Sequence, residues 1–180
     1  MPRVLLRLSL MLLLWPGTAA LAADVGIAAF QGVWRGNAVS ESQISANFKM
    51  TSRDIDVTVR TDADGGFAIT WNTVQRQKGD PNNPREELKS TKMQFTPARP
   101  GVWRAAANAD PLDSPAPFAW AFLKDRTLHI VSLRIYADGR HETQTYRRTL
   151  SGTGMALEFI RDVDGEQVRR ASGRLIKVAK

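Results

Sequence analysis

Hydrophobic and polar residues alternate with a period of two along much of the chain. In the segment 54–60, Ile55, Val57 and Val59 occupy every second position, and polar or charged residues stand between them. Because successive side chains of a strand point to opposite faces, this alternation predicts a strand with one buried and one solvated face. The segment 67–71 has the same spacing and predicts the returning strand of a hairpin.

Asp-Gly pairs separate several of the predicted strands, at Asp64-Gly65, Asp138-Gly139 and Asp164-Gly165. This dipeptide favours the positive φ angles that tight hairpins need. Strands about 8 to 12 residues apart with such turns between them are typical of an all-β sandwich or barrel. Further strands are expected at 87–96, 102–104, 127–136, 143–150, 155–161 and 168–178.

Proline-containing segments interrupt the middle of this pattern. The segments 79–84, 97–101 and 108–117 each contain two or more prolines. Proline cannot donate a hydrogen bond to a neighbouring strand, so these segments are predicted to be connections. Long connections in a compact β domain often carry contacts or lie at the open end of a barrel.

The first 22 residues have the pattern of a secretory signal peptide. Arg3 and Arg7 give a basic start, an apolar stretch follows, and Ala20-Leu21-Ala22 provides a small-residue cleavage site. The apolar stretch is shorter than the roughly 20 residues needed to span a bilayer. We therefore expect cleavage after Ala22 and a periplasmic or secreted location, with residues 23–180 forming a single domain.

Composition narrows the possible functions. The chain contains no cysteine, which excludes disulfides, thiolate metal sites and cysteine nucleophiles. Its net charge is +7, and the signal peptide accounts for two of the arginines. The charges are dispersed over turns and polar strand faces, so we expect a solvated surface and no nucleic-acid partner. The predicted strands are short for an outer-membrane barrel, so we expect a domain that does not span the membrane.

A short segment after the predicted cleavage site resembles the opening of the lipocalins and related calycin barrels. Gly32-Val33-Trp34 matches their Gly-x-Trp pattern at the start of the first strand. The resemblance implies a single antiparallel up-and-down barrel of about eight to ten strands, with Trp34 at its closed end. It also implies a basic residue from the last strand over the indole, with Arg174 as the first candidate and Lys177 as the second.

A barrel of this size either fills with side chains or holds one small ligand. Large aromatic residues in the alternating segments are candidates to line such a pocket, although aromatic residues also make up ordinary β cores. The proposed ligand-binding residues are Phe67, Trp71, Phe95, Trp120, Phe122 and Phe159.

The sequence contains no recognisable catalytic or metal-binding constellation, and no cofactor is indicated. Its two histidines are His129, inside a predicted strand, and His141, after a turn. His129 could act as a general base or ligate a haem iron. Asp162-Val163-Asp164-Gly165 lacks the rest of a calcium-binding loop.

The hypothesis that follows is an exported, non-catalytic protein that carries or sequesters a small apolar or lipid-like ligand. One alternative is an envelope protein-interaction module that acts through loops 79–84 and 108–117 and has a solid core. Another is an enzyme or haem barrel that uses His129. The volume of the barrel interior separates the first two hypotheses.

Overall fold

The computed structural model describes residues 25–44, 50–76 and 86–180. The signal peptide predicted over residues 1–22 and the loop predicted over 79–84 lie outside the described residues. A short 3-10 helix, η1 (Ile27–Phe30), precedes the strands. The strands are β1 (Gly32–Ser42), β2 (Met50–Thr61), β3 (Phe67–Arg76), β4 (Glu86–Arg99), β5 (Val102–Ala105), β6 (Phe118–Lys124), β7 (Thr127–Ile135), β8 (His141–Ser151), β9 (Gly154–Val163) and β10 (Glu166–Ala179).

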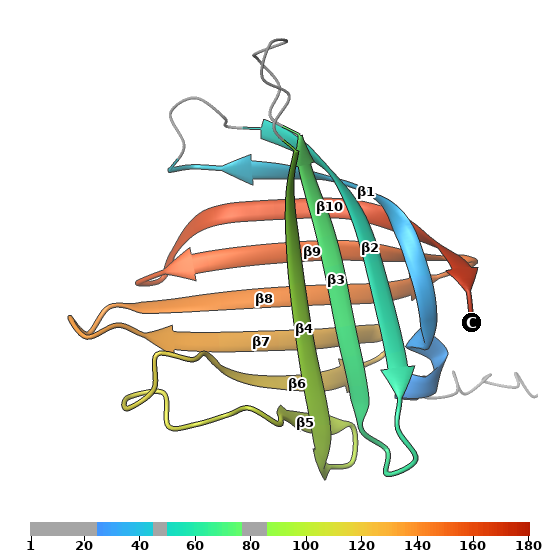
Figure 1. Cartoon of the computed structure of the whole chain (residues 1–180), viewed down its shortest axis with the longest axis horizontal. Coiled ribbons are helices and arrows are strands. Elements are labelled where there is room, and N and C mark those ends of the chain that lie inside the picture. Colours follow the sequence, from blue (N-terminus) through green and yellow to red (C-terminus); the bar gives the residue numbers. More distant parts are fainter. Residues whose placement is uncertain (1–24, 45–49, 77–85) are drawn as a thin grey trace, which may run out of the picture.

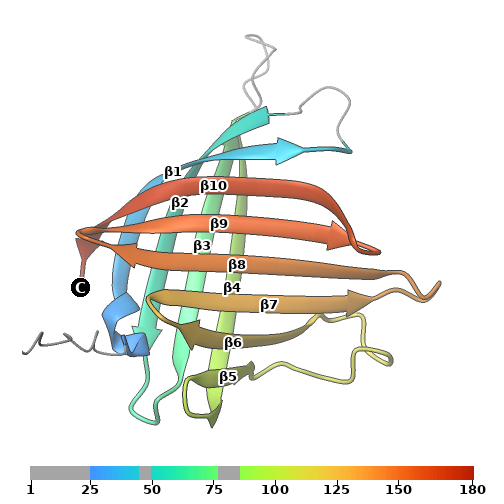
Figure 2. The ribbon, with the colours of Figure 1, turned by 180° about the vertical axis from the view of Figure 1, so that it is seen from behind.

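These ten strands form one closed antiparallel barrel. Each strand pairs with the next along the chain, and β1 also pairs with β10 to close the sheet (Figures 1 and 2). The predicted all-β, up-and-down barrel is therefore confirmed. Among the described residues, no helix is long and apolar enough to cross a membrane.

Local sequence explains both the strands and their turns. In β2, Ile55, Val57 and Val59 are buried as their spacing predicts. The hairpin between β9 and β10 turns at Asp164 and Gly165, whose φ angles are 53° and 84°. Two successive positive φ angles characterise the type I′ turn, which Asp-Gly favours and which matches the twist of the flanking strands.

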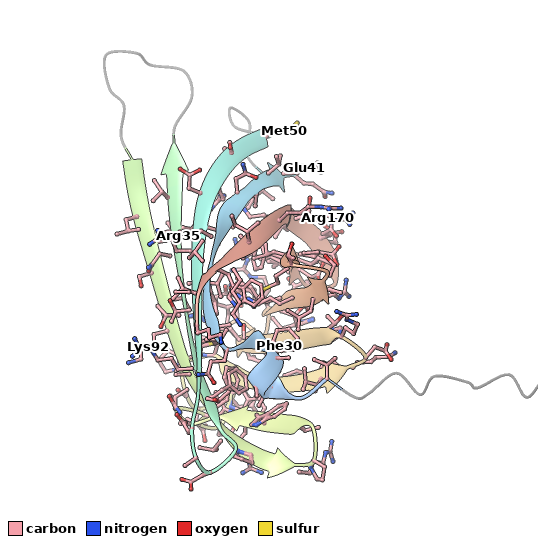
Figure 3. The ribbon with its side chains drawn as sticks, turned by 90° about the vertical axis from the view of Figure 1, so that its right-hand side faces the viewer. Phe30, Arg35, Glu41, Met50, Lys92 and Arg170 are labelled. Carbon is pink, nitrogen blue, oxygen red and sulfur yellow. The ribbon has the colours of Figure 1, made fainter. Side chains whose placement is uncertain are left out.

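One end of the barrel is closed by η1. Phe30 is fully buried, and its carbonyl oxygen accepts a hydrogen bond of 2.9 Å from Trp34 Nε1. Figure 3 shows Phe30 at this end, whereas Arg35 and Lys92 point away from the barrel. Gly32 has a φ of 128°, and a Cβ there would lie 2.5 Å from the carbonyl oxygen of Ala179. Glycine at this position therefore lets β1 start against β10.

The basic partner of Trp34 differs from the first candidate of the sequence analysis. Lys177 lies opposite Trp34 in the β1–β10 register, and its Nζ is 5.2 Å from the indole centroid. Arg174 pairs instead with Asn37, and its side chain is exposed. The expectation of Arg174 was wrong because the β1–β10 register places Arg174 opposite Asn37, three positions along β1 from Trp34.

Large aromatic side chains fill the interior next to the closed end. Phe67 and Phe95 stack with ring centroids 4.8 Å apart, and Trp103 meets Phe67 edge-on at 5.5 Å. The Trp103 indole also donates a 2.8 Å hydrogen bond to the carbonyl oxygen of Gly65. This half of the barrel is a packed core.

The orientation of β6 also differs from the sequence expectation. Ala119 and Ala121 are its fully buried residues, so the alternating residues Trp120 and Phe122 lie on the outer face. Ala121 is the cross-strand neighbour of Trp103. Because that indole occupies the interior beside it, a small residue faces inward at this level and the larger aromatics of β6 face outward.

Candidate ligand-binding site

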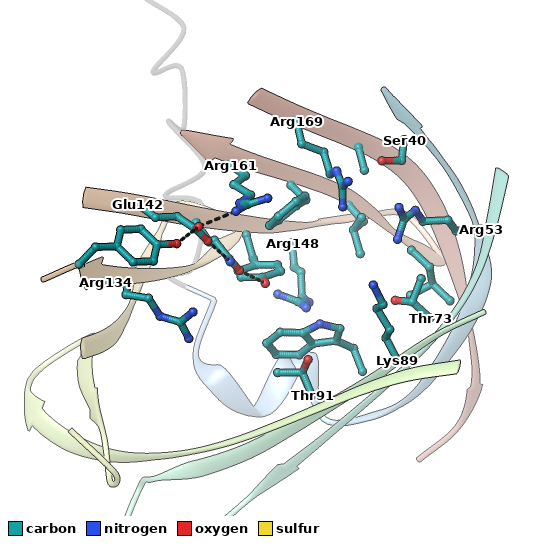
Figure 4. A pocket seen from close by; sticks show the side chains of 18 residues that line it. Ser40, Arg53, Thr73, Lys89, Thr91, Arg134, Glu142, Arg148, Arg161 and Arg169 are labelled. Atoms are coloured by element: carbon teal, nitrogen blue, oxygen red, sulfur yellow. Dashed lines mark hydrogen bonds and ion pairs between the residues drawn. The ribbon is translucent and has the colours of Figure 1, made fainter. Parts of the chain in front are cut away.

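A pocket of about 370 Å³ occupies the half of the barrel away from η1. Its lining residues come from β1–β4, from β7–β10 and from Tyr136 directly after β7, and they surround the space (Figure 4). A volume of this size lies at the lower end of the roughly 300–1,000 Å³ typical of pockets for small ligands. The interior is therefore open at one end and filled at the other.

Aromatic rings form the part of the pocket next to the packed core. The Tyr146 ring lies between Trp71 and Phe159, at centroid distances of 4.8 Å from each. Burial raises the pKa of Tyr146 to about 12, with Arg148 acting against that rise and Glu142 adding to it. The tyrosine is thus a neutral aromatic surface with one polar end.

Arg148 lies against this aromatic surface and is only 1% exposed. Its guanidinium carbon is 4.9 Å from the Trp71 centroid and 5.5 Å from the Tyr146 centroid. Burial lowers the pKa of Arg148 to about 10, with Tyr146 acting against that change, so the side chain stays charged at neutral pH. Among the described residues, its Nε and Nη1 have no hydrogen-bond partner.

Glu142 lies near the start of β8, toward the open end of the barrel, and its carboxylate accepts three hydrogen bonds. Arg161 Nη2 and the Tyr136 hydroxyl each donate to Oε2 at 2.7 Å, and Gln144 Nε2 donates to Oε1 at 2.6 Å (Figure 4). Burial alone would raise the pKa of Glu142, but these hydrogen bonds lower it to about 2. Glu142 is therefore an ionised residue that positions its neighbours.

Basic side chains dominate the charge of the pocket lining. Within the described part of the chain, six cationic residues and one carboxylate line the pocket, so its potential favours a negatively charged group. The cationic residues are Arg53, Lys89, Arg134, Arg148, Arg161 and Arg169.

The predicted ligand-binding residues divide into three groups. Trp71 and Phe159 line the pocket. Phe67 and Phe95 belong to the packed core. Trp120 and Phe122 lie on the outer face of β6, so they do not join the others. A ligand-binding role stays a prediction for Trp71 and Phe159, the two of the six that line the pocket.

Sequence reasoning missed the polar half of the pocket. Along β8, Glu142, Gln144, Tyr146 and Arg148 line the pocket, and the intervening residues are polar as well. A strand in a closed barrel with no apolar face must turn a polar face inward. That feature was the available signal for a polar interior.

Neither histidine lines the pocket. His129 faces outward from β7 and stacks on Phe122 with ring centroids 4.5 Å apart. Burial lowers the pKa of His129, and the charges of Arg147 and Lys124 lower it further. His141 Nδ1 lies 3.4 Å from Asp164 Oδ1 at the β9–β10 turn. The enzyme or haem hypothesis placed His129 at the site, whereas the pocket is formed by other residues.

The fold and the pocket together define a closed, ten-stranded antiparallel barrel with a basic, partly aromatic interior. The S-type phycobiliprotein lyase CPES from Guillardia theta is similar in structure, with a TM-score of 0.56 and 11% sequence identity over 87% of this chain and 94% of that chain. The 12:0-ACP thioesterase from Umbellularia californica aligns with a TM-score of 0.17 and 8% identity over 84% of this chain and 78% of that chain, too low to inform the fold.

The sequence comparisons find no family. No protein-family model matches the sequence, and a search of curated proteins finds no match. The similarity to the lyase at 11% identity establishes a shared barrel fold.

Proposed function

We propose that this protein is an exported, non-catalytic binding protein that carries or sequesters a small ligand inside its barrel. The ligand combines an apolar, aromatic or lipid-like part with a negatively charged group. The observation that carries this proposal is the pocket of about 370 Å³, where the rings of Trp71, Tyr146 and Phe159 meet a predominantly basic lining. The barrel fold shared with a phycobiliprotein lyase is compatible with an internal binding site.

The protonation states of the pocket favour binding over acid–base catalysis. A general acid or base works best with a pKa near the working pH. The pKa of Glu142 is about 2 and that of Tyr146 is about 12. Both groups therefore hold one protonation state across the neutral range and act as fixed hydrogen-bonding partners.

The alternative of an envelope interaction module depended on a solid core, and the open pocket does not favour it. Asn108, at the start of loop 108–117, is also hydrogen-bonded within the chain. The Asn108 side chain donates a 2.7 Å hydrogen bond to the carbonyl oxygen of Ala119 and accepts a 2.7 Å hydrogen bond from the backbone N–H of Ala119.

Ligand binding is tested with 1-anilinonaphthalene-8-sulfonate, a fluorescent aromatic anion. We expect saturable binding to one site and quenching of tryptophan emission, because Trp71 lines the pocket. The Trp71→Phe variant should lose most of that quenching. Trp120→Phe is the matched control on the outer face and should retain it. Binding without saturation, or quenching that depends on Trp120 rather than Trp71, would contradict an internal site.

Export is tested separately by expressing the complete chain in a Gram-negative bacterium. We expect a periplasmic product whose intact mass corresponds to residues 23–180, as cleavage after Ala22 predicts. A cytoplasmic product that retains the first 22 residues would contradict export and leave the binding proposal to its own test.

A further inference from the structure

We infer that Arg148 is the anchor for a carboxylate group of the ligand, which enters the barrel acid-first. This inference rests on the proposed binding function and adds the chemical class of the bound group, its contact residue and its orientation. Arg148 lies where the pocket meets the packed core, since its neighbours in the β-sheet register are Leu128 and Leu157 and both are buried.

The surroundings of Arg148 favour an external anion as its partner. A buried guanidinium normally pairs with a carboxylate, because an uncompensated charge in a low-dielectric interior is costly. Within the described residues, Glu142 is the carboxylate that lines the pocket, and it forms an ion pair with Arg161 at 2.7 Å. Among the described residues, no carboxylate forms an ion pair with Arg148, and its Nε and Nη1 lack hydrogen-bond acceptors.

The aromatic rings hold the guanidinium ready for such a partner. Trp71 and Tyr146 both lie within cation–π distance of it and restrict its orientation. A guanidinium presents its N–H groups in one plane, in a fork that matches the two oxygens of a carboxylate. Because the side chain is already ordered, little conformational entropy is lost when the anion binds.

The single charge of Arg148 matches a carboxylate better than a phosphate monoester. Arg148 supplies one positive charge at the buried end of the pocket, and Arg161, which also lines the pocket, is paired with Glu142. A carboxylate brings one negative charge, whereas a phosphate monoester brings almost two at neutral pH. An aromatic carboxylate would also place its ring beside Tyr146 and Phe159, which lie 4.8 Å apart.

The test uses naphthalene-2-carboxylate, its neutral analogue 2-naphthamide, and 2-naphthyl phosphate. Each compound competes with 1-anilinonaphthalene-8-sulfonate for the intact protein at pH 7. We expect the carboxylate to bind about tenfold more tightly than the amide, as a charge-assisted hydrogen-bonded pair predicts. The phosphate should bind more weakly than the carboxylate.

Three arginine variants then locate the effect. Arg148→Gln should abolish the preference, so that carboxylate and amide bind with about equal affinity. Arg147→Gln removes the same charge from the adjacent residue, which faces outward and pairs with Glu158 at 2.7 Å, and should keep the full preference. Arg148→Lys keeps a charge without the fork and should give an intermediate preference.

The outcomes separate the inference from the function on which it rests. If no compound displaces the fluorescent anion, the proposed function fails. If carboxylate and amide compete equally well in the wild-type protein, ligand binding stands and the assignment to Arg148 is overturned. A phosphate that binds more tightly than the carboxylate, with loss of that advantage in Arg148→Gln, overturns the carboxylate class. The wild-type comparison needs no variant to fold.

Discussion

Arg148 is a buried charge whose Nε and Nη1 have no hydrogen-bond partner among the described residues, so we expect it to lower the stability of the ligand-free protein. Burying a charged group without a partner costs several kcal/mol, and the rings of Trp71 and Tyr146 return about 2 kcal/mol by cation–π contact. We predict that Arg148→Met, which keeps a side chain of similar length, raises the free energy of unfolding of the ligand-free protein by about 1–3 kcal/mol. The same variant should lose carboxylate binding. Urea unfolding monitored by circular dichroism measures the first effect.

Arg147→Met provides the control for that prediction. Arg147 lies on the outer face and forms an ion pair with Glu158, with side-chain exposures of 42% and 26%. Surface pairs contribute about 0–1 kcal/mol, so its replacement should be neutral or slightly destabilising. A lower stability of Arg148→Met than of Arg147→Met would show that Arg148 is a structural residue.

Glu142 should make the protein sensitive to acid. Its pKa is about 2 in the folded protein, below the value of about 4.5 in the unfolded chain. The ionised carboxylate therefore contributes its full stabilisation above about pH 4.5, and that contribution is lost as the pH falls toward about 2. We predict that Glu142→Gln lowers the free energy of unfolding at pH 6 and that the difference from wild type narrows at pH 3.

Urea unfolding at the two pH values measures this difference. Glu166→Gln is the control, because Glu166 is an exposed glutamate at the start of β10. Replacing this exposed side chain should change the free energy of unfolding by less than about 0.5 kcal/mol. A difference between Glu142→Gln and wild type that stays constant from pH 6 to pH 3 would contradict the assigned pKa of Glu142.

At the scale of the elements, the closed end of the barrel depends on the contact between β1 and β10. Lys177 Nζ lies 5.2 Å from the Trp34 ring centroid, and a cation–π contact at the surface contributes about 0.5–1 kcal/mol. We predict that Lys177→Met lowers the free energy of unfolding by about that amount. Arg174→Met, three residues earlier on the same strand, should change it by less than about 0.5 kcal/mol. Equal effects would exclude a specific role for Lys177.

Local signals made some elements predictable and left others uncertain. The Asp164-Gly165 turn was predictable because two adjacent residues determine it. The inward face of β6 was not, since Ala119 and Ala121 alternate as regularly as Trp120 and Phe122. Only the position of Trp103 on the neighbouring strand decides which set faces inward. Contacts between strands carry that information, and a single sequence does not display them.

At the scale of the whole molecule, the barrel was predictable but its basic interior was not. The six pocket cations lie on β2, β4, β7, β8, β9 and β10 and are separated by long stretches of sequence. In the sequence, each one is an ordinary polar residue of an alternating strand. Closure of the barrel turns that face inward and brings together charges from six different strands.

The pairing of β1 with β10 also has a kinetic consequence. It joins the strand that opens the described barrel to the strand that ends it, so nearly the whole sequence forms the loop that this contact closes. Closing a loop of that length costs chain entropy before any contact compensates for it. We therefore expect hairpins between consecutive strands to form early and the seam between β1 and β10 to close last. Until it closes, the folding chain has two unpaired strand edges that can recruit another chain, so the seam is where folding competes with aggregation.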